Sequence, residues 1–248
     1  MTAGSRLWWA ALLAILAVGT GLRLRSAGGA PSLPEMQEIR RSETLEYFDL
    51  GQNLHDFGVL GWREEPSAFR GVLFPAFLSA AERYGASGPA RAPVIEAALC
   101  GLEIPLAAWL GLALHSPGAA LISAAFVAFH PALRELATPY QIDDFYGLLL
   151  MLVAVALAAW MRSPSAGRSW LLGFAVAASL LCRSVLFAFP PCLVLARLRG
   201  DARRRAFWVV LGASYLFLLP WVARNALQLR RFIPFEDHAA TQNFFAAA

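Results

Sequence analysis

The sequence contains no lysine, few cysteines and few charged side chains. All 21 basic residues are arginine, and Asp, Glu, Lys and Arg together make up only 15% of the 248 residues. Hydrophobic residues make up 58%, and the mean hydropathy is +0.53. This composition argues against a soluble domain and is typical of a membrane protein. The net charge of +4 lies largely in short loops, which indicates membrane topology and not nucleic-acid binding.

The scarce cysteines and histidines point to no redox or metal chemistry. Cys100, Cys182 and Cys192 all lie in apolar segments and lack metal-ligand spacing. His55 and His130 have no partner at ligand spacing, so a structural role is favoured for both. We therefore expect no cofactor, and the sequence leaves open whether a divalent metal is needed.

Seven apolar segments predict an all-α polytopic membrane protein. The expected spans are 7–22, 94–114, 118–133, 145–161, 170–182, 184–198 and 207–222. Two short helices that turn at Arg183 are favoured over one long helix, which would bury this arginine at mid-membrane. The arginines of 162–168 and 197–205 then share one side, which the positive-inside rule makes cytoplasmic. The N-terminus is cytoplasmic as well, and the first span is a retained anchor.

The chain is interpreted as one membrane domain, 1–248, with a long extracytoplasmic loop at 24–91 and an extracytoplasmic tail at 223–248. The loop contains the apolar stretch Gly71–Tyr84. As a helix, this stretch rises only about 21 Å, which is short of a bilayer core. Its apolar residues recur at helical spacing, so we expect an amphipathic helix that lies in the outer interface and does not cross.

The charged stretch from Ser42 to Gly58 predicts a second helix in this loop, with Ser42 as N-cap and Gly58 as C-terminal stop. At about 100° per residue, one face carries an acid among apolar side chains, and a second face is polar and solvated. The first face holds Glu43, Tyr47, Leu50 and Leu54, and the second Glu46, Asp49, Asn53 and Asp56. An acid in apolar surroundings holds its proton more tightly, which suits proton abstraction by Glu43. The alternative is that the acids of the first turn only complement the helix macrodipole.

With this topology, carboxylates, arginines and an amide from separate parts of the chain fall on the outer side. They are Glu43, Arg70, Asp143, Asp144, Arg183, Arg224 and Asn225. Arginine binds phosphate through two hydrogen bonds, and a carboxylate can take the proton of an acceptor hydroxyl, so the set suits a reaction on a phosphate-linked lipid. Structural alternatives stay open, because acids also cap helices and arginines also anchor helix ends in lipid headgroups.

Five motifs, in order along the chain, resemble those of the GT-C glycosyltransferases. This class includes protein O-mannosyltransferases and bacterial polyprenyl-phosphate-sugar transferases. The motifs are Glu43 four residues before Tyr47; R-G-V-L-F-P at 70–75, similar to R-x-P-L-Y-P; I-D-D-F-Y-G-L-L-L at 142–150; L-L-C-R-S at 180–184, similar to L-x-R; and P-W-V-A-R-N at 220–225, similar to P-W-x-x-R-N. The resemblance extends from Leu7 to about Phe235.

The resemblance implies an inverting glycosyltransferase of the bacterial plasma (inner) membrane, active in the cell envelope. The donor is a sugar on a polyprenyl phosphate, and the acceptor is a lipid, glycan or protein on the extracytoplasmic side. Nucleic acid is not an expected partner. By this resemblance, the catalytic carboxylates are those of Glu43, Asp143 and Asp144. The substrate-binding residues are Tyr47, Arg70, Arg183, Arg224 and Asn225.

The chain departs from this family in two respects. The first-loop acid is usually Asp, often within Asp-Glu, whereas this chain has Glu43-Thr44. The chain is also short for the family, so we expect a fragment, a truncated gene product or a degenerate paralogue.

The alternative function is a membrane transporter or a non-catalytic membrane partner. Glu96 and Glu103, seven residues apart within 94–114, share a helix face and favour it. Acids that converge at mid-membrane depth favour transport, whereas acids that converge at the membrane face favour transfer.

Overall fold

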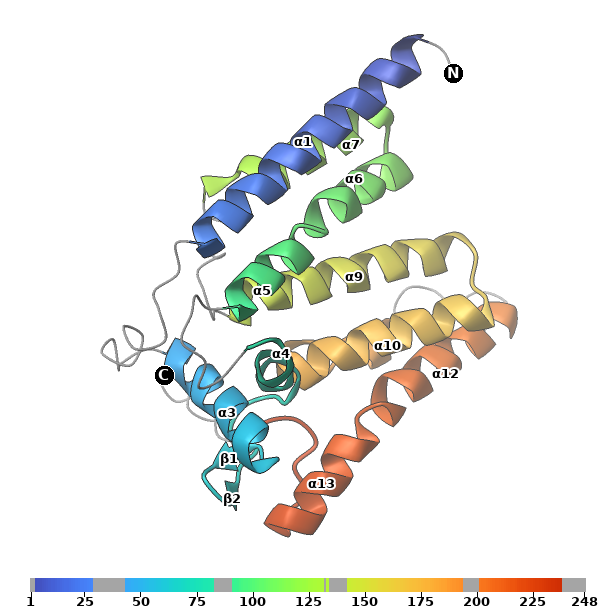
Figure 1. Cartoon of the computed structure of the whole chain (residues 1–248). Helices are drawn as coiled ribbons and strands as arrows, with labels where there is room; N and C mark the ends of the chain where they lie inside the picture. The colour runs from blue at the N-terminus through green and yellow to red at the C-terminus, as the bar shows by residue number, and fades with distance from the viewer. Residues whose placement is uncertain are drawn as a thin grey trace, which may run out of the picture. The chain divides into compact units, whose positions relative to one another are not determined.

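The computed structural model describes residues 3–28, 43–82, 91–131, 133, 142–193 and 201–237. These residues are helical apart from loops, one 3-10 turn and one small β-hairpin (Figure 1). The α-helices are α1 (Ala3–Gly28), α3 (Glu43–Phe57), α4 (Leu73–Ala81), α5 (Ala92–Cys100), α6 (Glu103–Leu114), α7 (Pro117–Phe129), α9 (Ile142–Arg162), α10 (Ala166–Cys182), α11 (Phe189–Cys192), α12 (Asp201–Leu216) and α13 (Leu219–Leu229). The all-α fold class predicted from the sequence is confirmed.

Four segments of the described chain are long and apolar enough to cross a membrane. They are Ser5–Gly28, Ala92–Leu114, Ile142–Arg162 and Arg203–Leu229. Two predicted spans are present as the shorter apolar helices α7 and α10. The protein is therefore an all-α membrane protein, but seven full-length spans are not shown.

The segment predicted as the sixth span, 184–198, does not form one helix. It begins with a 3-10 turn, η1 (Ser184–Leu186), and continues with the four-residue α11, whose first turn contains Pro190 and Pro191. Proline lacks an amide hydrogen and has a fixed φ, so it can begin a helix but interrupts one that runs through it. Residues 194–198 lie outside the described part of the chain.

The chain divides into two compact units. The first comprises Met1–Leu45 and Ala81–Ala158, and the second comprises Glu46–Ala80 and Ala159–Ala248. The helices α3 and α9 each pass from one unit into the other. We describe each unit by itself.

In the first unit, α6 and α7 form a tight helical hairpin, as the sequence predicted. Ser116 is the N-cap of α7 and accepts a hydrogen bond from the amide of Ala119 at 3.2 Å, and Pro117 follows in the first turn. Gly111 lies so close to the next helix that a Cβ atom there would be 2.7 Å from the carbonyl oxygen of Ala119. The absence of a side chain at residue 111 is therefore what allows the two helices to approach.

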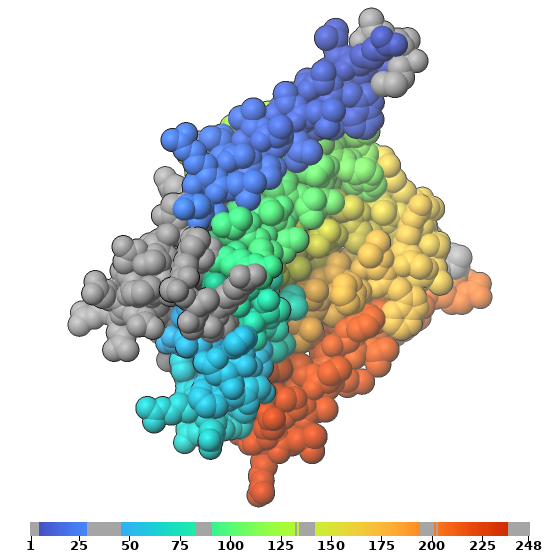
Figure 2. Space-filling model, in the orientation of Figure 1, coloured from blue at the N-terminus to red at the C-terminus, as the bar shows by residue number. Residues whose placement is uncertain are grey.

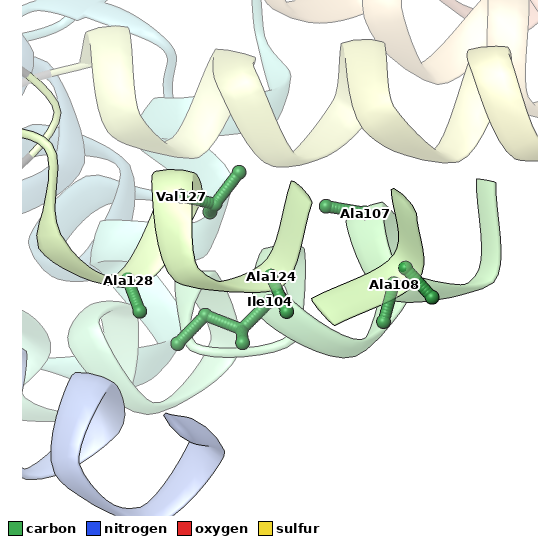
Figure 3. Packing of buried hydrophobic residues seen from close by; sticks show 7 residues of the cluster. Ile104, Ala107, Ala108, Ala124, Val127 and Ala128 are labelled. Atoms are coloured by element: carbon green, nitrogen blue, oxygen red, sulfur yellow. The ribbon is translucent and has the colours of Figure 1, made fainter. Parts of the chain in front are cut away.

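Small side chains also bring α1 onto this hairpin. A buried cluster of the unit, seen in Figure 3, consists of Ile104, Ala107, Ala108, Ala120, Ala124, Val127 and Ala128. A Cβ atom at Gly19 of α1 would lie 2.7 Å from Cβ of Ala128, so the two backbones nearly touch. Close packing through glycine and alanine is typical of membrane helices, which gain little from burying apolar area. Large apolar side chains such as Leu7 and Ile122 are 73% and 72% exposed, as expected of surface that faces lipid.

The helix α1 is longer than the sequence analysis predicted. The first span was expected to end at residue 22, with Arg23 in the loop that follows. Instead α1 continues to Gly28, and the Arg23 side chain is buried. Figure 2 shows α1 in blue, in contact with the green surface of α5 and α6, which agrees with the contacts that α1 makes in this unit.

In the second unit, α10 packs along α12 (Figure 1). The contact is close because Gly173 has no side chain; a Cβ atom there would overlap with Cβ of Ala213. The last predicted span, 207–222, is divided between α12 and α13, and α13 continues to Leu229. The extracytoplasmic tail expected from residue 223 therefore begins as helix.

The second unit also contains the described part of the long loop. Gly58 has a φ of +66° and ends α3, as predicted. A hairpin of β1 (Gly61–Trp62) and β2 (Glu65–Pro66) follows, which the sequence analysis did not anticipate. A helix is present within the predicted stretch Gly71–Tyr84 as the shorter α4, and its apolar stripe packs into the protein, because Phe74 and Leu78 have no exposed surface.

Candidate functional site

Tyr47 lies at the centre of a polar cluster in the second unit. Its side chain is 1% exposed, and its ring packs edge-on against that of Phe74 with centroids 5.4 Å apart. The guanidinium of Arg70 lies 5.3 Å from the centre of the Tyr47 ring. Burial raises the pKa of Tyr47 to about 12, and the nearby charges of Arg70 and Arg183 oppose this rise. The phenol is therefore a neutral hydrogen-bond donor at neutral pH.

Arg70 is held over Tyr47 by Glu46, which precedes the tyrosine on α3. Its Nε and Nη2 donate to Oε2 of Glu46 at 3.1 and 2.8 Å, and its guanidinium also lies 5.0 Å from the centre of the Phe69 ring. The Glu46 side chain is 39% exposed, so this ion pair adds little stability. The pair fixes the position of Arg70, whose own side chain is only 12% exposed.

Arg183 stands where α10 ends, as the sequence predicted. Its amide donates to the carbonyl of Ser179 at 2.8 Å, and its backbone is extended, with φ −145° and ψ 139°. Gly71, next to Arg70, lies against this helix end, because a Cβ atom there would be 2.5 Å from the carbonyl oxygens of Leu181 and Cys182. This close approach brings the segment that carries Arg70 to the end of α10, where Arg183 follows.

Arg224 and Asn225, the other predicted substrate-binding residues, are engaged with the protein backbone. Arg224 donates to the carbonyls of Ser67 and Leu60 at 2.8 and 2.6 Å. Asn225 is fully buried; its Nδ2 donates to the carbonyl of Ile233 at 2.9 Å, and its Oδ1 accepts from Arg224. These bonds hold α13 against the backbone of the long loop and of the segment after α13. The arginine and asparagine of the P-W-V-A-R-N motif therefore have a structural role in this chain.

A pocket of about 350 Å³ lies beside Arg224 in the second unit. Most of its lining is apolar, with contributions from Leu54, Val72, Leu181 and Trp221. Arg224 itself lies 5.1 Å above the ring of Trp221, at the polar part of the lining. Apolar walls beside a guanidinium suit the lipid portion of an anionic amphiphile.

Glu43 is the first residue of α3, and its side chain lies outside the described residues. It precedes Tyr47 by one helical turn, so the two residues share a face of α3. The apolar character predicted for that face is confirmed at Tyr47 and Leu50, which are both 1% exposed. The prediction of a solvated opposite face is wrong at Asn53, which is buried because its amide donates to the carbonyls of Val59 and Arg63 at 2.8 and 2.7 Å.

A second charged cluster lies in the first unit, around Arg23 of α1. Nη1 of Arg23 donates to both carboxylate oxygens of Asp144 on α9, at 2.8 and 2.9 Å, and Nη2 donates to Glu103 on α6 at 2.8 Å. All three side chains are buried, with exposures of 1 to 8%. Buried charges are tolerated when they are paired in this way, which explains why α1 continues through Arg23.

Two further groups of α5 border this cluster. Cys100 and Glu96, which are one helical turn apart, both lie within electrostatic range of Asp144. On α9, Gly147 leaves room for the Glu103 carboxylate, since a Cβ atom there would be 2.9 Å from Oε1. The single helix predicted over 94–114 is divided, so that Glu96 lies on α5 and Glu103 on α6, and the charge of Asp144 acts on both acids.

The remaining predicted catalytic residues differ in their surroundings. Asp143 is half-buried in the first turn of α9, where a negative charge complements the helix macrodipole. Both oxygens of Asp144 are held by Arg23, so its carboxylate is already used in an ion pair. Arg23 itself was missed because it follows the apolar run; the signal was the presence of acids within spans, which require a cation nearby.

Among the residues that the structure describes, no group of three or more His, Cys, Asp or Glu side chains is placed to hold a metal ion. Comparison of the chain with models of protein families, with curated proteins and with solved structures gives no match. The fold and its charged clusters define the class of the protein as an all-α membrane protein.

Proposed function

We propose that this protein is a GT-C-like glycosyltransferase that moves a sugar from a polyprenyl phosphate to an acceptor at the membrane surface. The observation that carries the proposal is the position of the Arg70 guanidinium, 5.3 Å from the centre of the buried Tyr47 ring, with the charge of Arg183 also acting on this phenol. Glu43 stands one helical turn away on the same face of α3. In this proposal Glu43 is the base, and Arg70, which lies over Tyr47 of the same helix as Glu43, binds the phosphate, in a protein with candidate membrane spans.

The reaction is a single displacement with inversion. The Glu43 carboxylate takes the proton of the acceptor hydroxyl, and the hydroxyl oxygen attacks the anomeric carbon opposite the phosphate. The bond from that carbon to the phosphate oxygen breaks, and the electron pair leaves with the polyprenyl phosphate. The Arg70 and Arg183 charges stabilise the leaving phosphate, and the Tyr47 hydroxyl can donate to it. Asp144 is an ion-pair partner of Arg23 in this proposal and takes no part in proton transfer.

The arginine at the end of α10 provides a direct test of the phosphate site. We expect Arg183→Gln to weaken binding of farnesyl phosphate, a short polyprenyl phosphate, by about 10- to 100-fold, since a hydrogen bond to a charged group contributes about 1.5–3 kcal/mol. Binding is measured by titration of the detergent-solubilised protein. The control is Arg204→Gln, which removes an exposed charge of α12. Equal losses in the two variants would indicate unspecific charge attraction and count against the site.

The proposal places the reaction on the extracytoplasmic side of a bacterial plasma membrane, with the N-terminus cytoplasmic. The nine residues of α4 rise only about 14 Å, too little to cross a bilayer core of about 30 Å. We therefore expect Ser42→Cys and Ser87→Cys, each in a cysteine-free background, to react with an impermeant thiol reagent from the outside. Labelling of the two sites from opposite sides would mean that the intervening chain crosses, and the shared external site would be lost.

The alternative, a transporter or a non-catalytic membrane partner, is favoured by one specific position. Glu103 begins α6, about 16 Å along the segment Ala92–Leu114, which is near its middle. Its partners lie nearer to helix ends: Asp144 is the third residue of α9, and Arg23 is five residues from the end of α1. Solute flux through proteoliposomes in the absence of any sugar donor would support this alternative over the transferase.

A further inference from the structure

The charged cluster of the first unit has more acids than cations. Arg23 contributes one positive charge, and Glu103 and Asp144 contribute two negative charges. A charged Glu96 would bring the total from −1 to −2. All of these side chains are buried in a helix bundle with an alanine-rich core, where unbalanced charge is costly. The bundle therefore favours uptake of a positive charge by one of the acids.

Glu96 is distinguished from the other acids by its lack of partners. The residue is only 4% exposed, and neither of its carboxylate oxygens has a hydrogen-bond partner among the residues that the structure describes. Asp144 and Glu103, by contrast, each receive short hydrogen bonds from Arg23. Hydrogen bonds from a guanidinium favour the charged form of a carboxylate, whereas apolar surroundings favour the neutral form of one that lacks such a partner.

We propose that Glu96 is a proton-binding site, with its carboxyl protonated at neutral pH beside the Arg23–Glu103–Asp144 cluster. The groups that act on it are Asp144 of α9 and Cys100 of its own helix; Glu103 of α6 and Arg23 of α1 are joined to it through Asp144. Repulsion from the Asp144 carboxylate and the apolar surroundings both favour the neutral acid. Neither effect depends on the proposed transfer reaction.

Release of this proton changes the charge of the cluster by one unit. The O–H bond of Glu96 breaks, the electron pair stays on the carboxylate, and the proton passes to water. The cluster then carries −2, and its like charges repel across the helices that supply them. In this proposal the contribution of Glu96 to stability is complete while its carboxyl is protonated, and it is lost as the pH rises and the proton leaves. Proton occupancy of Glu96 thus controls the packing of this helix bundle.

Infrared spectroscopy of the full chain in lipid bilayers tests the proposal. We expect the C=O stretching band of a protonated carboxylic acid at neutral pH, shifted in D₂O and absent from Glu96→Gln. The matched control, Glu65→Gln, changes an exposed acid of β2 and should keep the band. A wild-type spectrum without a protonated-acid band at neutral pH would overturn the proposal, whether or not the variants fold.

Thermal unfolding as a function of pH gives a second, independent readout. The wild-type midpoint should fall between neutral and alkaline pH, and that of Glu96→Gln should stay higher, because glutamine has the shape of the neutral acid without its proton. Glu96→Met serves where the glutamine variant folds poorly. A midpoint that depends on the Na⁺ concentration and not on pH would mean that the site binds a cation, and it would contradict the proton site.

Discussion

Glu43→Gln is expected to reduce sugar transfer by about 10²- to 10⁴-fold, the usual contribution of a general base, with no loss of expression or folding. Glutamine keeps the size and the hydrogen-bonding atoms of the side chain but cannot accept the hydroxyl proton. Glu43 is the first residue of α3, one turn before the buried Tyr47. The rate of transfer from a polyprenyl-phosphate sugar, measured at saturating donor, provides the test.

The helix that carries this base also provides the control. Asp56→Asn removes an exposed acid near the other end of α3, and transfer should stay at the wild-type rate. Full activity of Glu43→Gln, together with loss of activity in Glu46→Gln or Asp49→Asn, would show that the base lies on the other face of α3. The assignment of Glu43 would then be wrong even if the protein is a transferase.

Arg23→Met should destabilise the protein by about 3–5 kcal/mol, because it leaves Glu103 and Asp144 buried without their shared cation. Methionine keeps much of the length and apolar volume of the side chain, so the loss of stability measures the effect of removing the positive charge. The measurement is the free energy of unfolding of the detergent-solubilised protein in a denaturant titration.

Two residues further along α1, Arg25 offers a matched comparison. Its side chain is exposed, and Arg25→Met should change stability by no more than about 0.5 kcal/mol. Combining Arg23→Met with Glu103→Gln and Asp144→Asn should recover most of the loss, since no charge is then left unpaired. Equal effects of the two single variants would show that the buried ion cluster does not contribute to stability.

The sequence predicted features that depend on local signals. The helix end at Gly58, the turn before Pro117 and the end of α10 at Arg183 all follow from residues with strong conformational preferences. Apolar length likewise predicted the segments that appear as Ala92–Leu114 and Ile142–Arg162. These signals lie within the segment whose structure they determine, so the sequence of that segment is sufficient to detect them.

The features that the sequence analysis missed depend on distant partners. Arg23 pairs with Glu103 and Asp144, which are 80 and 121 residues away, and no local pattern reports that pairing. Arg224 was interpreted as a phosphate ligand, yet its guanidinium donates to the carbonyl of Leu60, 164 residues earlier in the chain. An arginine near a helix end suits lipid, phosphate and backbone carbonyls equally well, and only the fold decides among them.

Transfer of labelled sugar by the purified chain tests the central claim most directly. The chain is reconstituted in proteoliposomes with polyprenyl-phosphate sugars and with membranes that supply lipid, glycan and protein acceptors. We predict release of polyprenyl phosphate matched by sugar on an acceptor, with the Glu43→Gln protein as the blank. No transfer from any such donor, by protein shown to be folded in the same preparation, would contradict the proposed function.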